Sequence, residues 1–143
     1  MKALEGIETP ALLLDRARLT RNVQRMEERA RSLGVKLRPH LKTCKSVDVA
    51  HLIPSAASHG ITVSTVKEAE YFAAAGLRDQ LLAVAVAPSR LRRVAALLRD
   101  GVRTRVALDS PVAIDWLEDA ASREGVRFEA LVEIDCGEHR SGV

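Results

Sequence analysis

Short apolar or alternating runs and longer amphipathic patterns follow one another along the chain, and this alternation limits the fold more than any other feature. The runs with the period of a β-strand lie at 11–15, 35–42, 61–65, 81–86, 104–109 and 128–135. The patterns with the period of an α-helix lie at 16–33, 46–56, 66–75, 89–100 and 111–124. Strands that alternate with helices are typical of an α/β fold with a parallel sheet, which we therefore expect here.

The spacing of these elements suits either a barrel or an open doubly wound sheet. A complete eight-stranded barrel needs about 250 residues, whereas this chain has 143. We therefore predict a partial (β/α)8 TIM-type barrel, with about five of the eight barrel strands from residue 35 onward and an additional N-terminal strand. An open doubly wound parallel sheet is the alternative. Because no linker or low-complexity tract divides residues 1–143, we expect them to belong to a single barrel domain.

Composition and charge exclude several classes of partner. Net charge is only +3 and aromatic residues make up 3% of the chain, so a stacking platform for nucleic-acid bases is missing. No apolar run approaches the roughly 20 residues that span a membrane, and the N-terminus lacks the apolar core of a secretory signal. Cys44 and Cys136 lie far apart and do not predict a disulfide framework. We expect a cytoplasmic protein that binds neither nucleic acid nor membrane.

Polar residues collect behind the expected strands. Lys42, Ser64 and the segment 135–140 all follow the C-terminal end of a strand. In parallel α/β folds the active site forms at this edge of the sheet. Ser64 and Thr65 also precede a helical pattern, and Thr65 with Glu68 matches a capping box. Their first expected role is therefore to begin that helix.

The segment LRPHLKTCKS at 37–46 is rich in cations. If 35–42 is a strand, the residues on one side of it are Lys36, Arg38, His40 and Lys42. Neighbouring positive charge and partial burial disfavour the ammonium form of a lysine at a strand end, and Schiff-base chemistry with a carbonyl requires the neutral amine. Because the surroundings also suit an anion, a phosphorylated aldehyde would match both needs. The alternative is a solvated strand face that binds nothing, and Pro39 fits poorly inside a central strand.

Four stretches of the sequence together resemble one known family. They are IETPALLLDRARLTRNVQRM, RPHLKTCKS, ITVSTVKEAEYFAAAG and VEIDCGEHRSGV, and in this order they cover nearly the whole chain. They resemble the D-threonine aldolase and D-serine dehydratase family, which shares its barrel with alanine racemase among the fold-type III pyridoxal-phosphate enzymes. The most specific part is the R-P-H-x-K-T pattern, whose lysine carries the cofactor in that family. The last stretch matches its D-x-G-x-x-R-x-G pattern.

The resemblance implies roles for three residues. Lys42 would carry pyridoxal 5'-phosphate as an internal aldimine and later accept the proton of the substrate α-carbon. Arg140 would bind the phenolic oxygen of the cofactor or reach the substrate, because a guanidinium forms rigid, charge-assisted hydrogen bonds. The alternative for Arg140 is a salt bridge to Asp135 or Glu138. His40 is expected near Lys42, either as a catalytic group or in a structural hydrogen bond.

The sequence also departs from the family pattern. Family members are more than twice as long, with further barrel strands and a β-rich C-terminal domain that holds the metal ligands; the resemblance reaches only their N-terminal portion. We expect no metal site in this chain, because His40 with Cys44 and Cys136 with His139 give no complete ligand set. Cys44 stands where many members carry histidine. Lys45 is the rival of Lys42, and otherwise a surface charge.

The expected function is that of the N-terminal portion of a pyridoxal-phosphate-dependent lyase. Its substrate would be a small D-amino acid. The reaction would be aldol cleavage of a D-3-hydroxy amino acid or dehydration of D-serine. A pyridoxal-phosphate-dependent amino acid racemase is the first alternative, and a truncated chain without turnover is the second. Because open strand edges pair with other chains, we also expect self-association or a homo-oligomer.

Overall fold

The computed structural model describes residues 4–143, which fall into two compact units. The first unit ends at Val35 and contains α1 (Arg16–Ser32). The carboxylate of Asp15 accepts a 2.9 Å hydrogen bond from the amide of Arg18 and so caps this helix. The helix predicted at 16–33 is confirmed. The strand predicted at 11–15 is not formed, because a strand needs a neighbour and no described segment pairs with it.

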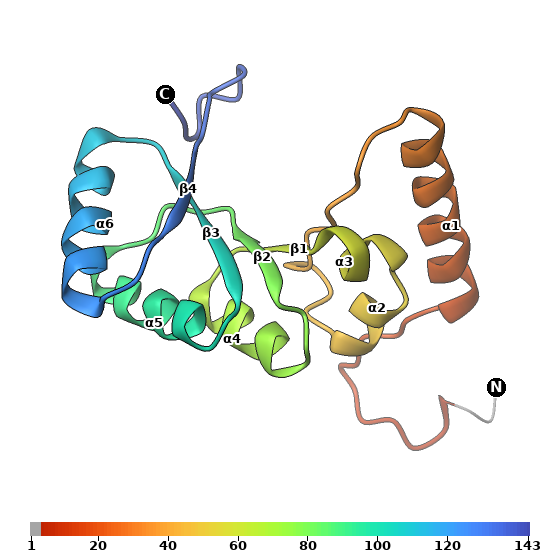
Figure 1. Ribbon diagram of the computed structural model, residues 1–143. Coiled ribbons are helices and arrows are strands. Elements are labelled where there is room, and N and C mark those ends of the chain that lie inside the picture. The colour runs from red at the N-terminus through yellow and green to blue at the C-terminus, as the bar shows by residue number, and fades with distance from the viewer. Residues whose placement is uncertain (1–3) are drawn as a thin grey trace. The chain divides into compact units, whose positions relative to one another are not determined.

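The second unit, Lys36–Val143, is built on a parallel sheet of four strands. They are β1 (Ile61–Val63), β2 (Asp79–Leu82), β3 (Arg103–Leu108) and β4 (Glu129–Val132). Each strand pairs with the next one in the sequence, in the order β1-β2-β3-β4 (Figure 1). In a doubly wound sheet the strand order reverses after the first strand, whereas in a barrel it follows the sequence. The α/β class is therefore confirmed, and the order is that of a partial barrel.

Five helices accompany the sheet of the second unit. They are α2 (Val47–His51), α3 (Pro54–His59), α4 (Val66–Ala74), α5 (Pro88–Arg99) and α6 (Pro111–Glu124). The single helix predicted at 46–56 is divided into α2 and α3, because Pro54 cannot donate a helical hydrogen bond and disfavours a helical conformation at the residue before it. The ends of the other three lie within two residues of the prediction. No described helix is long and apolar enough to cross a membrane.

The hydrophobic core lies between the sheet and the helices α4, α5 and α6, which Figure 1 shows along one face of the strands. Phe72 of α4, Ile61 and Val63 of β1 and Val94 of α5 are fully buried there. The side chain of Gln80 also enters this layer, where its Nε2 donates to the carbonyls of Ala69 and Leu77 at 3.0 and 2.8 Å. The helix-facing side of the sheet is thus packed and rigid.

The strand predicted at 35–42 exists only as one bridge beside β1. His40 pairs with Thr62 in parallel. The amide of Thr62 donates to the carbonyl of Pro39 at 2.8 Å, and the amide of Leu41 donates to the carbonyl of Thr62 at 3.0 Å. Because proline has no amide to donate, a longer ladder does not form here. The segment nonetheless occupies the position of a further barrel strand next to β1.

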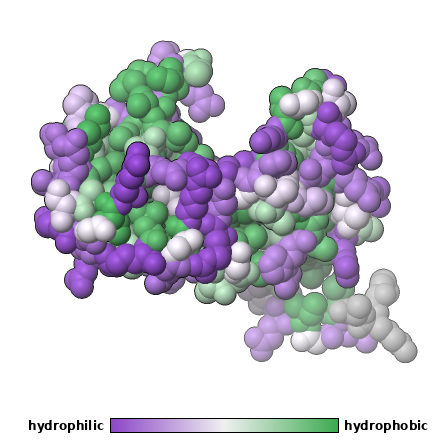
Figure 2. All heavy atoms as spheres, in the orientation of Figure 1, coloured by the Kyte–Doolittle hydropathy of each residue, from purple (hydrophilic) through white to green (hydrophobic). Residues whose placement is uncertain are grey.

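The other edge of the sheet, at β4, carries exposed apolar side chains. Leu131, Val132 and Ile134 are 47%, 63% and 62% exposed. Figure 2 shows hydrophobic residues gathered on the surface around this strand and the segment that follows it. The strand predicted at 128–135 is confirmed in its first part, and its apolar side chains have no covering layer among the described residues.

Candidate active site at the C-terminal ends of the strands

Lys42 lies in a tight turn immediately after the bridge to β1. The amide of Lys45 donates to the carbonyl of Leu41 at 2.9 Å and closes this turn, while Leu41 itself belongs to the core. Because the bridge is parallel, the turn lies at the C-terminal end of the sheet, the edge where the sequence predicts a site. Lys42 is exposed, so the partial burial expected for it is not observed.

The imidazole of His40 connects this turn to the end of β1. Its Nδ1 accepts a 3.3 Å hydrogen bond from the amide of Lys42, and its Nε2 lies 3.4 Å from the hydroxyl of Ser64. A neutral ring that accepts at Nδ1 carries its proton on Nε2 and can donate it to Ser64. Partial burial of the ring, followed by the Lys42 ammonium, lowers the pKa of His40 from its ordinary value, although the residue as a whole remains exposed. The shift favours the neutral ring.

Arg38 does not join Lys42, contrary to the expectation that the cations gather on one side. Its Nη1 lies 2.8 Å from Oδ1 of Asp79, the first residue of β2, at the N-terminal end of the sheet. Arg105 contacts the same oxygen at 2.8 Å. Burial alone would raise the pKa of Asp79, but the two guanidinium groups lower it. The long side chain of Arg38 reaches back along the strand to this carboxylate, which relieves the repulsion from Lys42.

Lys45, the rival of Lys42, is paired with the buried carboxylate of Glu68. Its Nζ lies 3.2 Å from Oε1 of Glu68, whose side chain is only 9% exposed. The other oxygen of Glu68 accepts a 2.8 Å hydrogen bond from the amide of Ser64, and the amide of Glu68 donates to Oγ1 of Thr65 at 3.1 Å. The predicted capping box is therefore present, with the carboxylate reaching one residue further back. Burial raises the pKa of Glu68, but the Ser64 amide and Lys45 outweigh it and lower the pKa.

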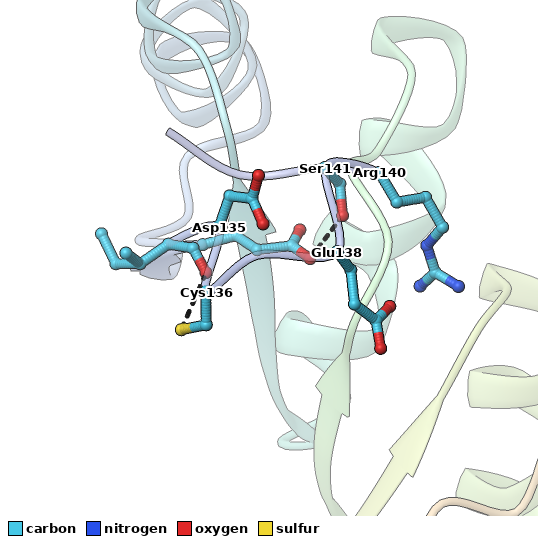
Figure 3. A pocket seen from close by; sticks show the side chains of 7 residues that line it. Asp135, Cys136, Glu138, Arg140 and Ser141 are labelled. Atoms are coloured by element: carbon cyan, nitrogen blue, oxygen red, sulfur yellow. Dashed lines mark hydrogen bonds between the residues drawn. The ribbon is translucent and has the colours of Figure 1, made fainter.

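Arg140 lies in a loop that Asp135 organises. Oδ1 of Asp135 accepts from the amides of Gly137 and His139 at 2.8 and 3.1 Å, and Oδ2 lies 2.9 Å from Nδ1 of His139. These amides and His139 lower the pKa of Asp135. Figure 3 shows the Arg140 guanidinium extending away from Asp135. The alternative considered for Arg140, a salt bridge to Asp135 or Glu138, is not formed, because Asp135 binds the loop backbone and His139 instead.

The loop of Arg140 encloses a small cavity but does not reach Lys42. The cavity has a volume of about 360 Å³ and is lined by residues 133–136, 138, 140 and 141. Within residues 4–143, no hydrogen bond or ion pair links Lys42 to Arg140, and the strands β2 and β3 lie between β1 and β4. The structure thus places the two cations at the same end of the sheet without bringing them together.

Two carboxylates of this arrangement were missed by reasoning from the sequence. Glu68 was expected only as a helix cap, and nothing local signals that it also binds Lys45 across 23 residues. The second strand of the sheet is predicted from the apolar run at 81–86, which Asp79 precedes. In the structure this strand, β2, begins at Asp79 itself. Among the described residues, no group of three or more His, Cys, Asp or Glu side chains could hold a metal ion.

Parallel strands that pair in sequence order define part of an α/β barrel. Lys42, His40 and Arg140 follow the carboxyl ends of its strands. Residues 14–143 match the family described as alanine racemase, N-terminal domain. The chain belongs to this family.

Similar proteins agree with this assignment. The chain is 46% identical over 137 residues to D-threo-3-hydroxyaspartate dehydratase of Delftia sp. strain HT23, covering 96% of this chain and 36% of that protein. It is 40% identical over 139 residues to 3-hydroxy-D-aspartate aldolase of Paracoccus denitrificans, again over 96% of this chain and 36% of the relative. The crystal structure of an alanine racemase-like protein from Idiomarina loihiensis superposes with a TM-score of 0.91 at 40% identity, over 96% of this chain and 37% of the other. The chain therefore spans little more than a third of the length of these relatives.

Proposed function

We propose that this chain is the N-terminal barrel portion of a pyridoxal-phosphate-dependent lyase that acts on small D-amino acids bearing a 3-hydroxyl group. The observation that carries the proposal is the turn that presents Lys42 at the C-terminal end of the sheet, tied to β1 through His40. The family and the names of the two curated relatives, a dehydratase and an aldolase of 3-hydroxyaspartate, support the substrate class.

The residues of the candidate site fit the chemistry of pyridoxal 5'-phosphate. The cofactor presents an aldehyde, a phenolic oxygen and a phosphate; when bound, it supplies an electron sink for bonds that break at the substrate α-carbon. A primary amine for the aldehyde is available in Lys42, which forms no ion pair within residues 4–143. A cation for the anionic groups is available in Arg140, which likewise contacts no carboxylate there.

In this proposal each of the three site residues has a separate role. Lys42 binds the cofactor through Nζ and then accepts or returns the proton at the substrate α-carbon. His40 fixes the backbone of Lys42 through Nδ1 and shares a hydrogen bond with Ser64. Arg140 holds negative charge on the cofactor or the substrate by charge-assisted hydrogen bonds. A divalent metal, where the full-length protein uses one, would take its ligands from outside the described residues.

Two other activities, racemisation and cofactor binding without turnover, are possible outcomes of the experiment described below. A racemase would use the same Lys42 but would need a second proton donor on the opposite face of the substrate. A chain that binds the cofactor without turnover would show the Lys42 chemistry alone. We also propose that the intact protein is a cytoplasmic homo-oligomer that takes a small D-amino acid as its substrate.

The test is reductive trapping of the cofactor, followed by product analysis. The chain is incubated with pyridoxal phosphate, reduced with borohydride and mapped by mass spectrometry, with Lys42→Ala as the control. We expect the adduct on Lys42, and its loss in the control without transfer to another lysine. An adduct found mainly on Lys45 would refute the assignment. For the intact protein, D-threo-3-hydroxyaspartate, D-threonine and D-serine are offered, and formation of the opposite enantiomer instead of a keto acid or aldehyde would favour the racemase.

A further inference from the structure

Two lysines stand three residues apart in the turn at the C-terminal end of the sheet, and the turn must present only one of them to a carbonyl ligand. Both Lys42 and Lys45 are exposed, so simple accessibility does not separate them. What separates them is their partners. Lys45 lies 3.2 Å from the carboxylate of Glu68, whereas Lys42 forms no ion pair within residues 4–143.

Glu68 is placed to bind both Lys45 and the end of β1. It lies on the first turn of α4 and is 8% exposed, with one oxygen on Nζ of Lys45 and the other on the amide of Ser64. The hydroxyl of Ser64 in turn lies 3.4 Å from His40, whose other nitrogen accepts from the amide of Lys42. A chain of contacts therefore runs from Lys42 through His40, Ser64 and Glu68 to Lys45.

Both ends of this chain of contacts, Lys42 and Lys45, lie in the same turn. The amide of Lys45 donates to the carbonyl of Leu41, and Lys45 has a φ of 44°, a left-handed conformation that side-chain-bearing residues rarely adopt. Such a conformation persists where surrounding contacts hold it. The ion pair with Glu68 supplies one such contact, at the last residue of the turn that begins beside Lys42.

We propose that Glu68 is a positioning residue that holds the Lys42 turn closed and keeps the amine of Lys45 occupied, so that only Lys42 is presented to an aldehyde. The Nζ of Lys45 lies 3.2 Å from the Glu68 carboxylate, and it must leave this contact before it can attack a carbonyl. The contact thus disfavours Lys45 as a competitor although Lys45 is exposed. This inference rests on the proposed role of Lys42, but the shielding of Lys45 can be measured independently of that role.

The experiment measures how strongly each lysine reacts with pyridoxal phosphate. The amine condenses with the aldehyde with loss of water, borohydride adds hydride to the carbon of the resulting C=N bond, and mass spectrometry counts the stable adduct at each lysine. Lys36, which is exposed and has no ion pair among the described residues, serves as the internal reference. In the unaltered chain we expect Lys45 to be labelled about three- to ten-fold less than Lys36, the range expected for a partly buried ion pair.

Glu68→Gln keeps a hydrogen-bond acceptor for the Ser64 amide but removes the negative charge. We expect the labelling of Lys45 relative to Lys36 to rise to about equality in this variant. The matched control is Glu70→Gln, on the same helix, whose carboxylate binds Arg93 instead; it should leave the Lys45 ratio unchanged. Equal labelling of Lys45 and Lys36 in the unaltered chain would overturn the proposal, and so would a Lys45 ratio that Glu68→Gln does not change.

A second variant keeps the test decisive if Glu68→Gln fails to fold. Lys45→Met removes the ion pair but leaves the α4 cap intact. If the pair holds the turn, the preference for labelling Lys42 over Lys36 should fall at least about two-fold in this variant; an unchanged preference would overturn the positioning role. In the unaltered chain, Lys42 could be labelled no more than Lys36 while Lys45 is labelled less than Lys36. This result would contradict the proposed function but would support the pairing of Glu68 with Lys45.

Discussion

Replacing Gly60 by alanine should destabilise the sheet far more than the same change at Gly76. Both glycines have positive φ, 76° and 88°, and both follow a helix. At Gly60, with a ψ of −172°, the backbone is in a region open almost only to glycine, which costs about 1–3 kcal/mol for another residue. A Cβ there would also collide with the carbonyl oxygen of Asp79 and with Nη1 of Arg38, and such overpacking costs about 1–3 kcal/mol.

At Gly76 an added Cβ meets nothing within 4 Å, so only the left-handed conformation counts, at about 1–2 kcal/mol. We therefore expect Gly60→Ala to lower the free energy of unfolding by about 2–6 kcal/mol and Gly76→Ala by about 1–2 kcal/mol. Urea denaturation followed by circular dichroism measures both. The centres of the two ranges differ by about 2.5 kcal/mol, so with a slope of about 1–3 kcal/mol per molar urea the unfolding midpoints should differ by about 1–2.5 M. Equal losses in the two variants would show that Asp79 and Arg38 move aside freely, and would refute the account of this end of the sheet.

Three further outcomes are expected. Cys44→Ser should change the free energy of unfolding by less than about 0.5 kcal/mol, because the thiol is exposed and its hydrogen bond within residues 4–143 is a long one, 3.7 Å to the Leu41 carbonyl; loss of a stoichiometric zinc in this variant would contradict the absence of a metal role. His40 should titrate below about 6.5 by NMR, since its pKa is lowered in the folded chain. The unfolded chain binds this proton at higher pH than the folded chain, so the free energy of unfolding falls as the pH drops from 6.5 toward the pKa of the folded chain. A titration midpoint at or above 6.5 would contradict the lowered pKa. Val132→Lys should reduce self-association in ultracentrifugation and binding of a hydrophobic dye, because Val132 is 63% exposed on an open edge strand; unchanged association would move the contact elsewhere.

The parallel order of the strands follows from the sequence because its two periodicities, two for strands and 3.6 for helices, are local properties. Each of the elements β1 to β4 overlaps a predicted run, although β2 shares only residues 81 and 82 with the strand predicted at 81–86. The helices α4, α5 and α6 begin at or next to their predicted first residues. The prediction was wrong at 11–15 and incomplete at 35–42, where alternation is present but a pairing partner or an amide donor is missing. Strand formation depends on a neighbour that local pattern does not reveal.

The candidate site shows the same division between local and long-range information. The capping box at Thr65 and the strand-end position of Lys42 are local, and both are found in the structure. The pairing of Glu68 with Lys45, and of Arg38 with Asp79 across 41 residues, depends on which side chains the sheet brings together. Repulsion among the cations of 36–42 is therefore smaller than the sequence suggests at Arg38, whereas Lys36 and Lys42 form no ion pair within residues 4–143.

The distribution of charge along the strands gives a reason, independent of any motif, for locating function at one end of the sheet. At the N-terminal end three arginines bind carboxylates: Arg38 and Arg105 share Asp79, and Arg103 binds Glu129 at 3.0 and 3.1 Å. The charges of these three arginines are thus neutralised within the sheet. At the C-terminal end Lys42 and Arg140 contact no carboxylate within residues 4–143, whereas Lys45 is neutralised by Glu68. Lys42 and Arg140 therefore stand at the edge where parallel α/β proteins bind their ligands, each available to an anionic ligand.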